Sequence, residues 1–182
     1  MPADDSTGGD SQSGYTALGD DQLLFIGGKY VRSSDGGTFP VTNPMTGEKI
    51  YDCASATTDD YTRAIEAAQT AFQTWSRTGP SARRLVLLKA ADVLETYLEK
   101  DAPELLSNEV SATRGWVRLN VLSTVNVLRE VAGLATHIKG EIVPADRPGT
   151  TILVERVAVG VNFAIAPWNA PVRSSTGSIH DS

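Results

Sequence analysis

The stretch VNFAIAPWNAPV, residues 161–172, decides how this chain is to be read. Residues 161–166 are almost all apolar, which predicts a strand of a parallel sheet that is covered on both faces. The run PWNAP at 167–171 then favours a turn. Such a strand needs neighbouring strands and covering helices, usually supplied by successive strand–helix–strand units. No such unit follows Val172, so the sequence predicts only part of an α/β domain.

Upstream of this stretch, short extended runs alternate with turn residues. LLFIGGKYV (23–31) and GTFPVTNP (37–44) predict two strands, and SSDGG (33–37) predicts the hairpin turn between them through its two glycines. NPMTG (43–47) predicts a further turn. A last extended run, 151–159, predicts an edge or hairpin strand just before the apolar one.

The middle of the chain has apolar residues at helical spacing. A first helix, capped by Thr58, places Tyr61, Phe72 and Trp75 on one face that we expect in the core. A second opens at Ser81 and a short third at Asp101. A longer helix begins at Trp116, ends at Gly140 and carries an apolar stripe made of Val117, Val121, Val125, Leu128, Ala132 and Ala135.

The stripe on the long helix would ordinarily cover a sheet that this chain supplies only in part. We therefore expect much of it to stay exposed, and the protein to melt broadly and to bind hydrophobic dye as a molten globule does.

Composition excludes several classes of function. The net charge is −6, and five aspartates within residues 1–22 contribute −5 of it, so the remainder is nearly neutral and argues against nucleic acid or an anionic membrane as partner. Residues 1–20 predict a disordered acidic tail. One cysteine permits no internal disulfide, and no apolar run approaches the roughly 20 residues of a membrane helix. We expect a cytoplasmic protein.

Several separated segments, in order, resemble the NAD(P)-dependent aldehyde dehydrogenase superfamily. They are TNPMTGE, FQTWSRT, ARRLVLLKAADVLE, ERVAVGV and IAPWNAP. NEVSATRGW, IKGEIVPADRPGT and IAPWNAPV are most similar to the branch that contains benzaldehyde, salicylaldehyde and vanillin dehydrogenases. The resemblance covers roughly residues 23–172.

The resemblance implies an incomplete α/β fold, the N-terminal part of a Rossmann-like coenzyme-binding domain. The expected parts are a disordered tail (1–20), the hairpin and helices of the coenzyme domain (21–139), a β segment like the family's oligomerisation arm (140–158), the first coenzyme-domain strand with the PWN turn (159–172), and a tail without family resemblance (173–182).

The resemblance also implies roles for the residues of the PWN turn. Asn169 would donate its side-chain amide to the oxyanion that forms when a cysteine thiolate attacks the aldehyde. Ile165, Ala166, Pro167 and Trp168 would line the cleft for NAD or NADP, at the carboxyl end of the strand. The family's nucleophilic cysteine and glutamate base come after this motif, and neither they nor a GxGxxG run is present in this chain.

Other residues have simpler interpretations. Cys53 has no nearby histidine or basic neighbour to lower its pKa, so we expect a structural or incidental role. His137 suits the end of a helix, where a cation is favoured, and His180 lacks the spacing of a metal ligand. Without the surrounding resemblance, PWN itself would be read as a proline-bounded turn.

Two functions follow as hypotheses. In the first, the chain is a truncated aldehyde dehydrogenase and is itself inactive. Its parent would oxidise an aldehyde to its acid, and the branch resemblance implies an aromatic aldehyde. In the second, it is a non-catalytic interaction module that forms a homo-oligomer or associates with full-length homologues through unpaired strand edges.

Overall fold

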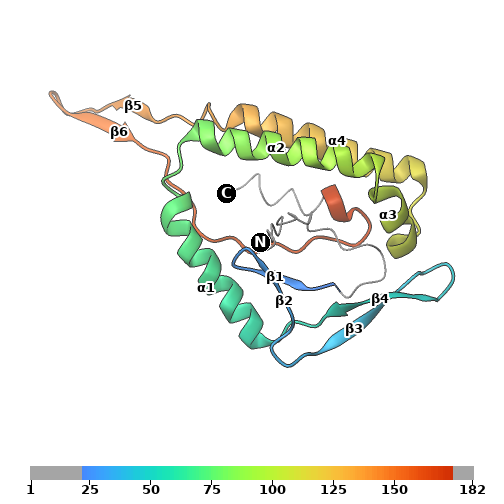
Figure 1. Ribbon diagram of the computed structural model, residues 1–182. Helices are drawn as coiled ribbons and strands as arrows, with labels where there is room; N and C mark the ends of the chain where they lie inside the picture. The colour runs from blue at the N-terminus through green and yellow to red at the C-terminus, as the bar shows by residue number, and fades with distance from the viewer. Residues whose placement is uncertain (1–21, 174–182) are drawn as a thin grey trace, which may run out of the picture.

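The computed structural model describes residues 22–173. The predicted tail at 1–20, His180 and all but the first residue of the predicted tail at 173–182 lie outside the described residues. Figure 1 shows the elements in chain order: β1 (Leu24–Ile26), β2 (Lys29–Val31), β3 (Thr38–Thr42), β4 (Lys49–Ala54), α1 (Thr58–Trp75), α2 (Pro80–Glu99), α3 (Ala102–Val110), α4 (Arg114–Leu134), β5 (Glu141–Pro144) and β6 (Thr151–Val154).

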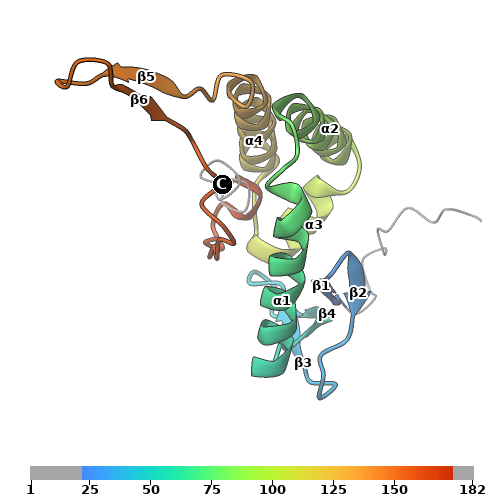
Figure 2. The ribbon, with the colours of Figure 1, turned by 90° about the vertical axis from the view of Figure 1, so that its left-hand side faces the viewer.

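The core lies among three helices. Helices α2 and α4 run side by side, with α3 at one end of the pair (Figures 1 and 2). Leu128, Val121 and Val117 of α4 are at most 2% exposed. They pack with Ala91, Ala102 and Leu106 and are flanked by half-buried residues of α2 that include Leu87, Leu94 and Leu98.

The predicted exposure of the long helix's stripe is therefore wrong. The face formed by Val117, Val121, Val125, Leu128 and Ala132 is buried. Helices α2 and α3 cover this face, because their own apolar stripes lie at matching helical spacing. The prediction failed because it assigned this face of the helix to a sheet. The molten-globule expectation, which rested on that exposure, loses its basis.

Helix α4 begins one turn before its first buried residues. The side chain of Thr113 accepts a hydrogen bond from the N–H of Trp116, which satisfies one of the free donors at the helix start. The helix ends at Leu134, before the predicted stop at Gly140. Nδ1 of His137 lies 2.9 Å from the carbonyl oxygen of Gly133, so this histidine caps the last turn as expected.

Two hairpins precede the helices, and their turns correct the prediction. Gly27 and Gly28, both at positive φ, join β1 to β2 inside the run that was predicted to be one strand. Two adjacent residues at positive φ suit a tight hairpin turn, which the Gly-Gly pair allows. Residues 33–37 instead connect β2 to β3. The predicted turn at 43–47 is confirmed, since it joins β3 to β4.

The two hairpins touch the rest of the chain at a few places. Gln22 bridges to Cys53 of β4 and so links the first hairpin to the second. The hydroxyl of Tyr51 donates a hydrogen bond to Glu109 of α3. Burial, and then this bond to an anion, raise the pKa of Tyr51 well above its ordinary value.

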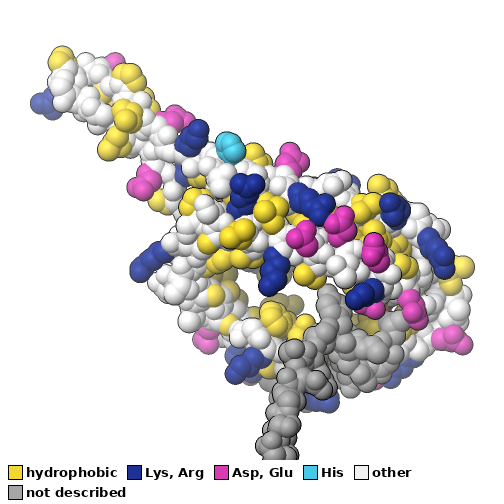
Figure 3. Space-filling model, turned by 45° about the horizontal axis from the view of Figure 1, so that its top comes forward, with side chains coloured by type: hydrophobic (Ala, Val, Ile, Leu, Met, Phe, Trp, Pro, Cys, Tyr) yellow, Lys and Arg dark blue, Asp and Glu magenta, His cyan; other side chains and the backbone are white. Residues whose placement is uncertain are grey.

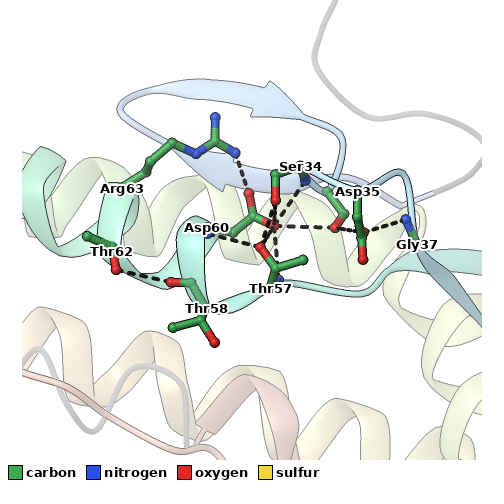
Figure 4. Close-up of polar contacts among 9 residues, drawn as sticks. Ser34, Asp35, Gly37, Thr57, Thr58, Asp60, Thr62 and Arg63 are labelled. Atoms are coloured by element: carbon green, nitrogen blue, oxygen red, sulfur yellow. Dashed lines mark hydrogen bonds and ion pairs between the residues drawn. The ribbon is translucent and has the colours of Figure 1, made fainter.

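The start of α1 is built around Asp60, which is 1% exposed. Figure 4 shows its carboxylate among Ser34, Thr57 and Arg63. It accepts hydrogen bonds from the N–H groups of Thr57 (3.0 Å) and Ser34 (3.1 Å), and it pairs with Arg63. Thr57 caps the helix, one residue before the predicted Thr58. Hydrogen bonds to the carboxylate, the Thr57 N–H first, hold the pKa of Asp60 far below its usual value.

The apolar face of α1 is less buried than predicted. Tyr61 is 55% exposed and Trp75 is 47% exposed, while Phe72 is half-buried. Figure 2 shows the reason: α1 descends away from the α2–α4 pair and lies beside the hairpins. A different side of α1 approaches β1–β2, where a Cβ on Gly27 would lie 3.8 Å from that of Ala67.

Strands β5 and β6 form a hairpin that projects from the helical layer (Figure 1). Every residue of β6 is exposed, and Ile142 and Leu153 are each 74% exposed. At the base of the hairpin, a Cβ on Gly140 would lie 2.4 Å from the carbonyl oxygen of Val154. The absence of a side chain at residue 140 therefore allows the two chain segments to meet.

The predicted strand at 161–166 does not form. These residues are extended and exposed, and β6 ends at Val154 although the sequence predicted a strand to residue 159. A strand requires a neighbour for its backbone hydrogen bonds, and none pairs with 159–166 within the described residues. Apolar composition of this kind favours a buried strand, but composition does not supply the neighbouring strand.

Candidate functional site

The candidate site is the turn at Trp168 and Asn169, which follows the extended segment. Both side chains are exposed, Trp168 by 76%. Residues 171–173 are helical. Val172 returns to the core and packs beside the residues of α2, α3 and α4. The turn thus lies between the extended segment 161–167, which pairs with no strand among the described residues, and Val172, which packs on the core.

Helix α4 makes two hydrogen bonds to this segment. The indole Nε1–H of Trp116 donates to the carbonyl oxygen of Asn169 at 3.1 Å. One helical turn later, Oδ1 of Asn120 accepts from the backbone N–H of Arg173, also at 3.1 Å. Asn120 is only 4% exposed, so its side chain is fixed inside the structure.

Of the predicted cofactor residues, 165–167 lie on the extended run, and Trp168 lies in the turn beside Asn169. All four are exposed, Ile165 by 83%. Because these residues are consecutive in the chain, they lie together beside Asn169, the predicted oxyanion donor. An exposed backbone and apolar side chains of this kind can form one wall of a nucleotide cleft, whereas the opposite wall is not formed by residues 22–173 as described.

A separate groove of about 540 Å³ lies between α2, α3 and α4. Its walls include Glu95, Glu99, Arg114 and Arg118. Arg114 and Arg118 are offset by two residues from Trp116 and Asn120, about 200° around the helix, so the groove and the Asn169 turn lie on opposite sides of α4. The groove is open and of mixed charge (Figure 3 shows both signs over the helical layer), and nothing connects it to the predicted chemistry.

Cys53 lies in β4, paired with Phe39 of β3, and is half-buried. Burial, and then the nearby charge of Glu109, raise the pKa of its thiol. A raised pKa disfavours the thiolate that a nucleophile requires. The raised pKa therefore argues against Cys53 as a nucleophile.

Metal chemistry finds no support in the described part of the chain. Among residues 22–173, no three His, Cys, Asp or Glu side chains gather to hold an ion. In the same range, no helix is long and apolar enough to cross a membrane.

Sequence reasoning missed the involvement of Trp116 and Asn120. The sequence predicts Trp116 only as the start of a helix and gives Asn120 no role. The signal available in the sequence was Asn120 itself, a polar residue four positions after Trp116 and beside an apolar stripe. Its position indicates a buried polar contact. The partners of these two residues are 53 positions further along the chain, beyond the reach of local patterns.

Comparison with known proteins gives consistent matches. The sequence pattern of the aldehyde dehydrogenase family matches residues 30–181. The chain is 42% identical over 146 residues to a salicylaldehyde dehydrogenase of Pseudomonas putida, covering 80% of this chain and 30% of that protein. It is 40% identical over 163 residues to a vanillin dehydrogenase of Pseudomonas fluorescens, covering 87% and 33%.

Solved structures give the same result. The crystal structure of the Pseudomonas putida G7 salicylaldehyde dehydrogenase with salicylaldehyde superposes with a TM-score of 0.83 at 38% identity, over 90% of this chain and 34% of that one. A betaine aldehyde dehydrogenase of Staphylococcus aureus with NAD+ gives 0.83 at 28% identity, over 90% and 32%.

The chain thus spans about a third of the length of the relatives that it matches. Its mixed helices and strands correspond to a partial, N-terminal part of the aldehyde dehydrogenase fold, as the sequence predicted. The sequence match over residues 30–181 and the agreement of the folds establish that this chain belongs to the aldehyde dehydrogenase family.

Proposed function

We propose that this chain provides the N-terminal part of an enzyme that oxidises an aromatic aldehyde to its carboxylic acid with NAD or NADP. The identity to salicylaldehyde and vanillin dehydrogenases, about 40%, is the observation that supports this substrate class. Bound NAD+ in a structural relative supports the cofactor. A cytoplasmic location is part of the same proposal.

Within this activity, Asn169 is the proposed oxyanion donor. Its exposed side chain stands at the end of the apolar run, where a carboxamide N–H could reach an oxygen that gains negative charge. Residues 165–168 are proposed to line the nicotinamide cleft. A nicotinamide cofactor would accept hydride from the intermediate. Residues 165–168 would bind and orient this cofactor and keep water away from the reacting carbon.

A chimera tests the proposal. Residues 30–173 of this chain replace the matched segment of the Pseudomonas putida salicylaldehyde dehydrogenase, and reduction of NAD+ is followed with salicylaldehyde, vanillin and an aliphatic aldehyde. We expect the aromatic substrates to be preferred. Asn169→Ala should lower kcat by roughly 10²–10³, the usual cost of one lost oxyanion donor.

Asn162→Ala is the matched control, because Asn162 is an exposed asparagine on the same extended run. Its kcat should remain close to that of the unmodified chimera. Equal losses in both variants would refute the specific role of Asn169. A folded chimera that prefers the aliphatic aldehyde would refute the aromatic substrate class.

For the chain by itself, we propose no dehydrogenase activity. By resemblance the nucleophilic cysteine and the glutamate base come after the PWN motif, and the thiol of Cys53 has a raised pKa. Purified chain with salicylaldehyde and NAD+ should give no reduced cofactor above the buffer rate. Turnover that Cys53→Ser abolishes would reverse this assignment.

A second proposed function is association through the β5–β6 hairpin. It projects from the helical layer and carries exposed apolar side chains, among them Ile142 and Leu153 (Figures 1 and 3). Strands with free edges and apolar faces add readily to another sheet. Light scattering should show a dimer or a larger assembly, and Leu153→Lys should shift it toward monomer. An unchanged mass would exclude the hairpin as the interface.

A further inference from the structure

We infer that helix α4 sets the position of the Asn169 turn through Trp116 and Asn120, which are therefore positioning residues for the proposed oxyanion donor. The inference rests on the proposed function for its catalytic meaning, whereas the contacts themselves are part of the structure. Neither residue is expected to touch the reacting atoms.

The two contacts share one geometry. Trp116 and Asn120 are four residues apart on α4, so their side chains project from one face of the helix. Asn169 and Arg173 are also four residues apart. The two hydrogen bonds, both 3.1 Å, therefore bracket the segment from Asn169 to Arg173 and hold it along one turn of α4.

The hydrogen bond between Asn120 and Arg173 resembles a helix N-cap, except that the capping side chain comes from α4. Residues 171–173 are helical, and an N–H at the start of a helix has no partner within that helix. Oδ1 of Asn120 supplies the acceptor for Arg173. On the other side, the carbonyl oxygen of Asn120 accepts from the hydroxyl of Thr124 at 2.8 Å, and both residues are buried.

The Trp116 bond fixes the other end of the segment. It reaches the carbonyl oxygen of Asn169 itself, so it restrains the peptide plane that follows the Asn169 side chain. Val172, packed against the core between the two polar contacts, prevents the segment from sliding. The extended run before Asn169 is exposed and unpaired within residues 22–173, so among the described contacts α4 supplies the restraint.

This arrangement has a consequence for catalysis. Oxyanion donors are effective because they are oriented before charge develops, and a shift of about 1 Å is costly. A donor on a turn needs a rigid support, and α4 is buried along one face. Substitutions at residues 116 and 120 should therefore loosen the Asn169 turn without unfolding the helices.

Amide hydrogen exchange by NMR on the whole chain tests the inference. In Trp116→Phe, which keeps an aromatic ring and removes the N–H donor, the amides of the segment should exchange about fivefold faster, the factor expected for one hydrogen bond. The amides to be followed are those of Asn169, Ala170, Val172 and Arg173. In Asn120→Ala, the Arg173 amide should exchange at least about tenfold faster, because its N–H loses its acceptor. Leu119→Ala, on the exposed side of α4, is the matched control and should leave these rates unchanged.

Two further measurements separate positioning from general stability. Asn120→Asp keeps the oxygen acceptor, so it should restore slow exchange at Arg173. The indole N–H resonance of Trp116 should lose its hydrogen-bonded shift when Pro171→Gly loosens the turn. If Asn120→Ala unfolds the chain, Trp116→Phe still decides the outcome.

Unchanged exchange at 169–173 in Trp116→Phe, or equal acceleration throughout α4 in every variant, would overturn the inference. The result is independent of the proposed activity. A chimera without dehydrogenase activity, combined with the expected exchange pattern, would remove the proposed function and leave the positioning contacts in place.

Discussion

Replacing Leu128 by Ala tests whether the α2–α3–α4 core is packed as described. Leu128 is 2% exposed and lies in the buried face of α4. Removing a buried leucine side chain costs its transfer free energy and leaves a cavity, together about 3 kcal/mol. That loss changes the folding equilibrium constant roughly a hundredfold.

The matched control is Leu119→Ala. Leu119 lies on the same helix and undergoes the same chemical change, but it is 56% exposed, so its loss should be about 1 kcal/mol or less. The helix-forming tendency changes equally in both variants and cancels in the comparison. The difference between them therefore reports tertiary packing.

Urea unfolding followed by circular dichroism measures the difference. With an m-value of about 2 kcal/mol per molar, Leu128→Ala should lower the midpoint by roughly 1.5 M, against about 0.5 M or less for Leu119→Ala. Near-ultraviolet signals and the absence of dye binding should show fixed packing in the unmodified chain. Equal midpoint shifts, or strong dye binding before any denaturant is added, would refute the packed core and restore the molten-globule expectation.

Three other changes have definite outcomes. Ser111→Gly should stabilise the chain by about 1 kcal/mol in a thermal melt. Ser111 has φ 53° at the end of α3, and this backbone region favours glycine. In addition, the hydroxyl of Ser111 is buried without a partner among the described residues. Gly140→Ala should accelerate amide exchange in the β5–β6 hairpin and leave the melting of the helices unchanged, since the added Cβ would press on the carbonyl of Val154. The free energy of unfolding should decline as the pH falls below about 4, because the depressed pKa of Asp60 provides stabilisation that is complete above the unfolded pKa and is lost on protonation. Asp60→Asn should be less stable at neutral pH, and its stability should depend less on pH. A pH profile identical to that of the unmodified chain would exclude Asp60 as the source of the dependence.

Local patterns predicted the helices well. The spacing of Val117, Val121, Val125 and Leu128 identified the stripe of α4, and the NPMTG turn was predicted from its proline and glycine. Both signals act over a few residues, where backbone preference and side-chain periodicity dominate. The resemblance based on separated segments identified the family.

Predictions about partners failed where the partner lies far away in the chain. The sequence could not show that α2 and α3 cover the stripe of α4 or that the Trp75 side chain is about half exposed. It also could not show that 161–166 has no strand beside it in the described residues. The first hairpin was misplaced because Gly27–Gly28 and Gly36–Gly37 are both acceptable turns, and only pairing between strands selects one. The contacts of Trp116 and Asn120 belong to the same class of long-range information.

The core cluster of the three helices also indicates the order in which the chain assembles. Apart from Val172, all its members lie between residues 87 and 128, so the loops that close during its formation are short. Short loops lose little entropy, and structures rich in nearby contacts fold quickly. We therefore expect α2, α3 and α4 to form a nucleus first during synthesis, while the hairpins dock afterwards and the segment around Val172 arrives last.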